Sequence, residues 1–414
     1  MKLKKVLLLL TTILIASCGK RVESTEEKVN LSVSVWGSSP EETALVDRQI
    51  LMFEEKYPNI KVTKEVVTGD YNQVLQTNIA ARIESDVFYI DSAVAPMYID
   101  KKAILPLNEY LDTEDLKDFN DNLLEGFSED GKVYGLPKDY NPLVLAYNKD
   151  MFEKAEISSV PRNWEEWLIA FQKLKSAGEA GKLGKNFMYP MSSITAGERT
   201  ATFILQNGGD VFDNENGRVT FNLDVAVEGL KYFYNLIKDG YVREPRAMGE
   251  GWNGDAFARE KVAMTIEGGW MIPYLATAAP NLNYDLAKIP MGKEEGTMLF
   301  SVAYSMGRNT KYPKEAVEFI KFMTGKEAQM LMVQSGLGLP TRKSLNDKFI
   351  KLHPTKEAMI EMSPFGRAYN FGKKGLKVAN ELGKANEIIY IDYVNGKYDI
   401  DVKKILDDYA EKAK

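Results

Sequence analysis

Residues 29–90 read VNLSVSVWGSSPEETALVDRQILMFEEKYPNIKVTKEVVTGDYNQVLQTNIAARIESDVFYI. Three short stretches have the composition of β-strands, two with alternating or β-branched apolar residues and one apolar throughout, at 31–35, 60–67 and 87–90. The segments between them have apolar residues at helical spacing, at 40–57 and 71–83. Pro40 fits a first helical turn, and Asp70 can cap the second helix. Strands that alternate with helices predict right-handed βαβ units and an α/β fold.

The remainder of the chain is richer in helix. Asn163 is a predicted cap before Trp164, and Thr324 with Glu327 forms a predicted capping box that opens a helix to about Val333. Further helices are expected at 198–207, 226–238 and 402–413. Further strands are expected at 262–266, 284–287 and 302–306.

The first residues have the layout of a secretory signal peptide. Three lysines, at positions 2, 4 and 5, precede an apolar run at 6–14 that is too short to span a bilayer, and small residues follow at 15–18. We expect a signal peptide at 1–17, with Cys18 as the lipid-modified residue of a bacterial lipoprotein; the alternative is that the cysteine is accidental. Residues 18–28 are polar and aperiodic, which predicts a flexible tether. An extracytoplasmic protein anchored to the membrane by lipid is expected.

Composition excludes much of the usual catalytic repertoire. Cys18 is the only cysteine and His353 the only histidine, so disulfides, thiolate metal sites, a cysteine nucleophile downstream of Cys18 and histidine relays are not expected. His353 precedes Pro354 and is interpreted as an incidental surface residue. The formal net charge of −6 disfavours nucleic acid as a partner. We therefore expect no catalytic residue, metal or cofactor.

Ligands of open parallel sheets bind beyond the carboxyl ends of the strands. The chain is rich in rings, with 21 Tyr, 18 Phe and 5 Trp, and several lie in such loops, where core packing does not explain them. Aromatic faces that stack on pyranose rings, together with carboxylates that accept hydroxyl hydrogen bonds, suit a carbohydrate. Asp91 has the alternative of capping the next helix, and Trp164 and Trp167 are interpreted as packing residues. The candidates from this rule and from a glycine-flanked polar loop are Trp36, Asp70, Asp91, Glu267, Trp270, Trp252 and Asp255.

Three groups of motifs, in order along the chain, carry a resemblance to a known family. The first is GKVYGLP at 131–137 with LAYNK at 145–149 and PRNW at 161–164. The second is AFA at 256–258 with VAM at 262–264 and GGW at 268–270, and the third is AVEFIKF at 316–322 with GLGLP at 336–340. The chain resembles the extracellular solute-binding proteins of family 1, which are substrate-capturing lipoproteins of ABC importers, most of them for sugars.

The resemblance implies a type II-like periplasmic-binding-protein fold, with two α/β lobes and a ligand cleft between them. The implied N-terminal lobe is 29–139 plus 289–335, and the C-terminal lobe is 140–288 plus 336–414. The implied crossing segments lie near 138–142, 284–290 and 335–340. Two departures affect local loops: Glu260 stands where relatives often have glycine, and 84–86 read ESD where many have a glycine and a proline.

The resemblance also implies ligand contacts. Trp270 occupies the place of a tryptophan that stacks on sugar, and Trp36 and Asp91 occupy positions that commonly line the cleft. Tyr140 and Asn141 fall at the first crossing. Arg342, Arg367 and Tyr369, in the C-terminal part of the chain, are further candidate ligand contacts that no motif supports.

The expected function is the capture of a sugar, specifically an oligosaccharide, by a monomer that delivers it to the permease subunits of an ABC transporter. The same fold binding a polyamine or a glycerol-phosphate type ligand is the first alternative, because polyamines also suit aromatic rings with carboxylates. A secreted glycoside hydrolase is the second, and it requires two carboxylates about 5–9.5 Å apart.

Overall fold

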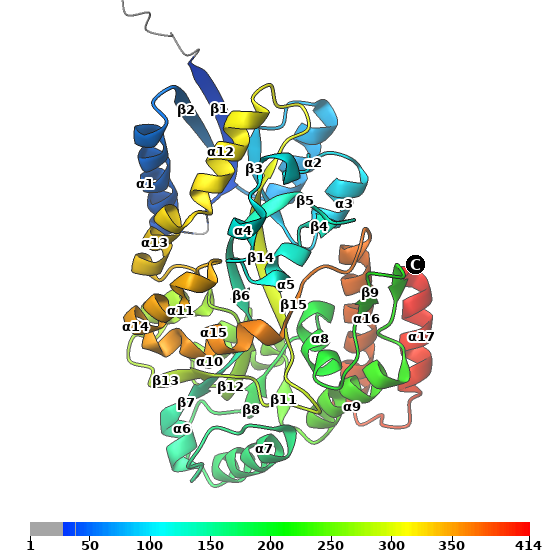
Figure 1. The fold of residues 1–414 in the computed structure, drawn as a ribbon. Coiled ribbons are helices and arrows are strands. Elements are labelled where there is room, and N and C mark those ends of the chain that lie inside the picture. The colour runs from blue at the N-terminus through cyan, green and yellow to red at the C-terminus, as the bar shows by residue number, and fades with distance from the viewer. Residues whose placement is uncertain (1–27, 38) are drawn as a thin grey trace, which may run out of the picture.

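The chain folds around two separate β-sheets, which lie in the upper and lower parts of the molecule in Figure 1. The computed structural model describes residues 28–37 and 39–414. The predicted signal peptide, Cys18 and all but the last residue of the predicted tether lie outside the described residues. The α/β fold class expected from the alternating strands and helices is confirmed.

The first sheet has the order β15-β14-β3-β1-β2, and β6 pairs along β14. The strands β2, β1 and β3 are parallel to one another, whereas β3 and β6 are antiparallel to β14. The bounds of these strands are β1 Val29–Trp36, β2 Ile60–Val67, β3 Val87–Asp91, β6 Gly135–Pro142, β14 Thr297–Met306 and β15 Gly366–Ala368. The helices packed around this sheet are α1 Pro40–Lys56, α2 Tyr71–Ala81, α3 Ala95–Asp100, α4 Thr113–Leu116, α5 Asp121–Glu125, α12 Pro313–Met323 and α13 Lys326–Ser335.

Local sequence explains the first βαβ unit. Alternate residues of β1 are fully buried, and the apolar stripe of α1 packs against them through Ile50 and Phe53. The amide of Gln73 donates to the Asp70 carboxylate at 3.0 Å, so the predicted cap of α2 is confirmed. The parallel pairing of β1 with β2 brings their carboxyl ends, at Trp36 and Val67, to one edge of the sheet.

The second sheet has the order β11-β8-β12-β7-β13. In it β11, β8 and β12 are mutually parallel, and β7 lies antiparallel between β12 and β13. Its strands are β7 Val144–Asn148, β8 Tyr189–Ser192, β11 Val242–Arg243, β12 Val262–Glu267 and β13 Tyr284–Ala287. The surrounding helices are α6 Lys149–Lys154, α7 Trp164–Glu179, α8 Gly197–Leu205, α9 Asp224–Lys238, α10 Asn253–Ala258, α11 Met271–Ala278, α14 Asn346–Leu352, α15 Glu357–Met362, α16 Gly375–Val394 and α17 Val402–Ala413.

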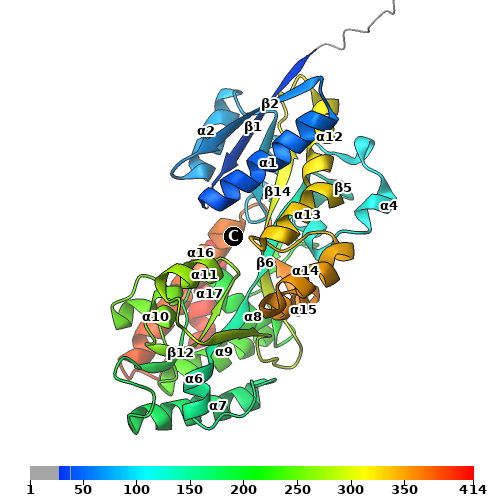
Figure 2. The ribbon, with the colours of Figure 1, turned by 90° about the vertical axis from the view of Figure 1, so that its left-hand side faces the viewer.

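Two long strands, β6 and β14, run between the two parts of the molecule (Figures 1 and 2). Leu136 of β6 packs in the core of the first sheet, and Leu143, just beyond β6, packs in the core of the second. On β14 the order is reversed, with Leu299 in the second core and Ala303 in the first. The chain therefore crosses between the cores within these two paired strands.

The second crossing differs from the predicted one at 284–290. Residues 284–287 form β13, which pairs with β7 inside the second sheet, and Ile289 packs in the core of that sheet. We propose that the second crossing lies at 299–302 and that the return to the N-terminal lobe begins there rather than at 289. The remaining lobe boundaries stay as proposed from the sequence.

Two other local expectations are corrected, and the departure from the family pattern at Glu260 is located in the backbone. The predicted capping box at Thr324 does not form, because its buried hydroxyl donates to the Ile320 carbonyl at 2.8 Å and Gly325 caps α13. β14 begins at Thr297, five residues before the predicted strand. Glu260 adopts φ 55°, the left-handed conformation that glycine reaches without strain. Among the described helices, none combines the length and apolarity needed to cross a bilayer.

Candidate ligand-binding site

The loops after β1, β2 and β3 form one wall of a candidate site. Trp36, Asp70 and Asp91 line a single pocket of about 600 Å³, together with Tyr71. These residues come from three segments of the chain that meet because the parallel strands end at one edge. The structure thus brings together the three first-lobe residues that the carboxyl-end rule selected.

Trp36 is held in position by two tyrosine rings. Its indole packs edge-on against Tyr71 and Tyr89, with ring centroids 4.9 and 5.1 Å away. The Tyr71 hydroxyl lies 3.1 Å from the carbonyl oxygens of Ser34 and Tyr89, so it ties α2 to both neighbouring strands. Because Trp36 is only half-buried, part of its ring remains available at the pocket.

Asp91 accepts a hydrogen bond from the Ala93 amide at 2.8 Å. It does not cap α3, which begins at Ala95, so the capping alternative is wrong. Burial, assisted by the nearby Asp139 carboxylate and opposed by the Ala93 hydrogen bond, raises the pKa of Asp91 from its usual 3.8 to about 6. A buried carboxylate with spare lone pairs is suited to accept hydrogen bonds from ligand hydroxyl groups.

The raised pKa of Asp91 predicts a pH dependence. The folded state binds this proton more readily than the unfolded state, so the contribution of Asp91 to stability is greatest at low pH and falls as pH rises from 3.8 to about 6. Affinity for a ligand that donates to the carboxylate should change in the opposite direction, falling by up to about tenfold between pH 7 and pH 5. Calorimetric titrations of the wild type and of Asp91→Asn across this range check the prediction. A variant with the same pH profile as the wild type would contradict it.

A second group of candidate side chains, in the second lobe, is organised by Glu267 at the end of β12. Its side chain is 2 % exposed, and it accepts hydrogen bonds from Arg199 Nη1 at 3.2 Å, Trp270 Nε1 at 2.8 Å and Asn253 Nδ2 at 3.0 Å. Both carboxylate oxygens are therefore engaged. Glu267 fixes the orientation of the surrounding side chains, which differs from the direct ligand contact expected from the sequence.

Trp270, Phe300, Tyr369 and Arg199 form a cluster beside Glu267. The Arg199 guanidinium lies 5.1 Å from the Trp270 ring centroid and 5.2 Å from that of Phe300. Phe300 contacts Trp270 and Tyr369 edge-on, with centroids 5.5 Å apart in both pairs. Since Phe300 lies on β14, the crossing strand itself supplies an aromatic surface to the site.

Asn141 lies at the same junction. It pairs with Phe300 in the β6–β14 ladder. A Cβ atom on Gly269 would lie 2.5 Å from the Asn141 Oδ1 atom and 2.8 Å from the Met359 side chain, so the turn before Trp270 packs closely against both side chains. The Asn141 side chain therefore lies beside Gly269, the residue that precedes Trp270, and both predicted residues belong to the same part of the structure.

Trp252 and Asp255 lie beside this cluster on and before α10. Trp252 is half-buried against Tyr274, with ring centroids 5.0 Å apart, and the Tyr274 hydroxyl donates to Asp255. That hydrogen bond raises the pKa of Tyr274 to about 12. Asn253, the residue after Trp252, donates a hydrogen bond to Glu267, so this loop contacts the Glu267 cluster.

Tyr140 and Arg342 are not placed as predicted. Tyr140 is fully buried, with its hydroxyl 3.1 Å from Ser363 Oγ, and burial raises its pKa to about 12. Arg342 is 1 % exposed and donates to both carboxylate oxygens of Asp115, at 2.7 and 2.9 Å. Because its donors are used inside the fold, Arg342 is a structural residue. Arg367, also considered from the sequence, donates to Asp210 at 2.9 Å.

Arg199, Asn253 and Phe300 were missed by sequence reasoning. Arg199 lies in the first turn of α8, just beyond the carboxyl end of β8, so the same rule would have selected this region had β8 been predicted. Phe300 was missed because β14 was expected to start later. Nothing in the local sequence indicates that Asn253 bonds Glu267.

Two α/β lobes joined by crossing strands, with rings and carboxylates near the strand ends of both lobes, define a two-lobed solute-binding protein. The chain belongs to the bacterial extracellular solute-binding protein family, whose model matches residues 37–330, so the predicted resemblance is confirmed. It is 24% identical over 410 residues to the galactooligosaccharide-binding protein of Bacillus subtilis, which covers 97% of this chain and 93% of that protein. It is 26% identical to the multiple sugar-binding protein of Streptococcus mutans, over 77% of each chain.

A solved structure shows the same fold. The ABC substrate-binding protein of Listeria monocytogenes in complex with cycloalternan superposes with a TM-score of 0.78 at 22% identity, covering 94% of this chain and 98% of that one. The two-lobed architecture expected from the sequence is confirmed by this match.

Proposed function

We propose that this protein captures an oligosaccharide outside the cytoplasm and delivers it to the permease of an ABC importer. The observation that carries the proposal is the presence of aromatic rings and charged groups near the strand ends of both lobes. One group comprises Trp36, Asp70 and Asp91, and the other comprises Trp270, Phe300 and Tyr369 around Arg199. Rings in both groups suit the apolar faces of successive sugar units, and carboxylates with a guanidinium suit their hydroxyl groups.

The proposed capture of the ligand does not require the protein to catalyse a reaction. A ligand that contacts both groups binds the closed arrangement more tightly than the open one, and this difference in affinity shifts the population toward closure. Bending at the paired strands β6 and β14 would move one group against the other. The closed monomer would then dock on the permease, and a signal peptide at 1–17 with a lipid on Cys18 would keep it at the membrane.

The site is less suited to the alternatives. A polyamine would fit the carboxylates of the first group but would meet the Arg199 guanidinium in the second. A phosphate ester would be repelled by Asp70 and Asp91. A hydrolase would need a general acid and a nucleophile or base placed about the same sugar bond, and Glu267 is unsuited to either role because both of its oxygens are already hydrogen-bonded.

A thermal-shift screen of residues 19–414 tests the proposal. Mono- and oligosaccharides, glycerol phosphate and spermidine are the probes. A ligand at 100 times its dissociation constant adds about 2.7 kcal/mol to stability, so an oligosaccharide series should raise the melting temperature clearly. A response to spermidine or glycerol phosphate without any response to sugars would overturn the choice of ligand.

A further inference from the structure

One buried side chain, that of Gln329, connects two of the proposed crossing segments. Gln329 belongs to α13, which lies next to α14 where the two parts of the molecule meet (Figure 2). Its side chain is fully buried, and its Nε2 atom donates to the Lys138 carbonyl of β6 at 2.8 Å. Its Oε1 atom accepts a hydrogen bond from the Thr341 amide at 3.1 Å. Lys138 lies in the first crossing and Thr341 directly follows the third, so a single amide group binds both.

The first crossing has a β-bulge at the residue that Gln329 binds. Asp139 and Pro137 pair with consecutive residues of β14, so Lys138 between them is an extra residue in the ladder. A bulge of this kind bends the strand that carries it. Because Lys138 is only 4 % exposed, the hydrogen bond from Gln329 to its carbonyl is made inside the protein. Gln329 therefore holds the bend of the first crossing.

The first and third crossings also contact each other directly. A Cβ atom added to Gly338, in the third crossing, would lie 3.2 Å from the Asp139 Cβ atom in the first. The helix that carries Gln329 is fixed to the first lobe, since Gln49 of α1 donates to the Ala328 carbonyl at 2.9 Å. Gln329 thus reaches two adjacent crossings from a helix that is anchored in one lobe.

The bulge is linked to the first group of candidate ligand contacts. The Lys138 ammonium lies 4.8 Å from the centroid of the Tyr89 ring, and Tyr89 packs edge-on against Trp36. The same ammonium is held by Asp139 and, at 3.1 Å, by Glu42 of α1. A shift of the Lys138 backbone would therefore displace the ring that supports Trp36.

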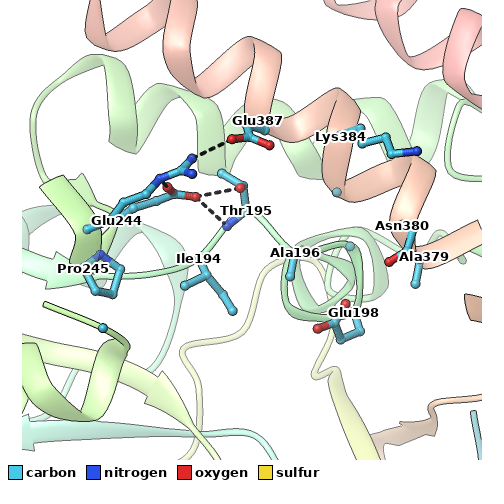
Figure 3. Close-up of a pocket in the computed structure, with 14 residues that line it drawn as sticks. Ile194, Thr195, Ala196, Glu198, Glu244, Pro245, Ala379, Asn380, Lys384 and Glu387 are labelled. Carbon is cyan, nitrogen blue, oxygen red and sulfur yellow. Dashed lines mark hydrogen bonds and ion pairs between the residues drawn. The ribbon is translucent and has the colours of Figure 1, made fainter. Parts of the chain in front are cut away.

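Gln329 is separate from the places where a ligand would touch the protein. It does not line the pocket at Trp36. Nor does it line a second pocket of about 450 Å³, which is enclosed by the first turn of α8, the segment at 244–246 and α16 (Figure 3). An effect of Gln329 on affinity would consequently act through the crossings.

We infer that Gln329 is a positioning residue for ligand capture, which joins the first and third crossings so that they bend as one hinge. The inference rests on the proposed function, because it concerns how the closed arrangement is reached. A hinge whose segments are already held together loses less conformational freedom on closure than a loose one. The intact side chain should therefore favour the liganded state.

Replacing Gln329 with methionine tests the inference, because this change keeps the volume and removes both hydrogen bonds. Calorimetric titration and stopped-flow dissociation with malto- and galactooligosaccharides should show an affinity about tenfold below that of the wild type, mostly through faster dissociation. Gln49→Met is the matched control, because Gln49 is also a buried glutamine that donates to a carbonyl, but it joins two helices of the first lobe. It should lower stability by a similar amount and leave affinity unchanged.

Hydrogen–deuterium exchange without ligand separates this inference from the proposed function. Peptides covering 135–142 and 335–341 should both exchange faster in Gln329→Met, and neither should change in Gln49→Met. Acceleration confined to 335–341, or wild-type affinity in folded Gln329→Met, would overturn the inference and leave the proposed function standing. Absence of sugar binding by the wild type would overturn the proposed function, whereas acceleration of both peptides would still support the connection between the crossings.

A milder variant covers the case in which Gln329→Met does not fold. Gly338→Ala adds a Cβ atom where the two crossings touch and forces them apart by a few tenths of an ångström. It should accelerate exchange in both peptides and weaken sugar binding in the same direction. Unchanged exchange and affinity in this variant would count against a hinge made of the two crossings together.

Discussion

Replacing Glu267 with alanine is expected to weaken oligosaccharide binding by about 100-fold, a larger effect than that of any other single residue of the two groups. The reason is that the carboxylate positions three side chains at once, Arg199, Trp270 and Asn253. Its removal also leaves the largely buried Arg199 guanidinium without its ion-pair partner, which should lower the free energy of unfolding by about 2–3 kcal/mol. Calorimetric titration and urea unfolding measure the two effects.

Comparison of Glu267→Ala with Trp270→Ala separates two effects on affinity, namely the positioning of side chains by Glu267 and the direct contact of Trp270 with the ligand. That variant removes the aromatic surface but retains the Arg199–Glu267 ion pair, so it should lose affinity with a smaller change in stability. Glu228→Ala is the control for loss of a glutamate, because this side chain is exposed and its ion pair with Lys293 spans 3.5 Å. Full affinity in a folded Glu267→Ala protein would show that ligand binding does not need the hydrogen bonds that Glu267 accepts from Arg199, Trp270 and Asn253.

The Arg342→Met variant is expected to be less stable by about 3 kcal/mol and to bind sugar normally. Arg342 is buried over the Phe119 ring at 3.9 Å, donates to the Thr324 carbonyl at 2.8 Å and pairs with Asp115. Methionine retains most of the volume but leaves the carbonyl and carboxylate acceptors without their donors. The midpoint of urea unfolding should therefore decrease while the dissociation constant of the oligosaccharide stays unchanged.

Lys343→Met provides the matched control. Lys343 is the next residue, but it is exposed and lies 4.0 Å from Asp121, so its removal should change stability by no more than about 0.5 kcal/mol. A folded Arg342→Met protein that is as stable as the control but binds sugar weakly would restore Arg342 to the ligand site and contradict the structural assignment.

Much of the first lobe could be predicted because its information is local. Alternating apolar residues and caps define β1, α1, β2 and α2 within one or two residues of the observed bounds, and Asp70 caps α2 as expected. The carboxyl-end rule, applied to strands predicted from the sequence, selected Trp36, Asp70 and Asp91 without any knowledge of strand order or packing. The second lobe was harder, because β8 is short and its strand signal is weak.

The sequence by itself determined the α/β class, the family and the loops that surround the site, since these depend on periodicity and on motifs in their order along the chain. Only the tertiary structure decided what each charged group does there. Glu267 and Arg199 are 68 positions apart, and Arg342 and Asp115 are 227 apart, so no local pattern marks either pair. A buried charge needs a partner, and the partner is whichever group the packing of distant segments brings within reach.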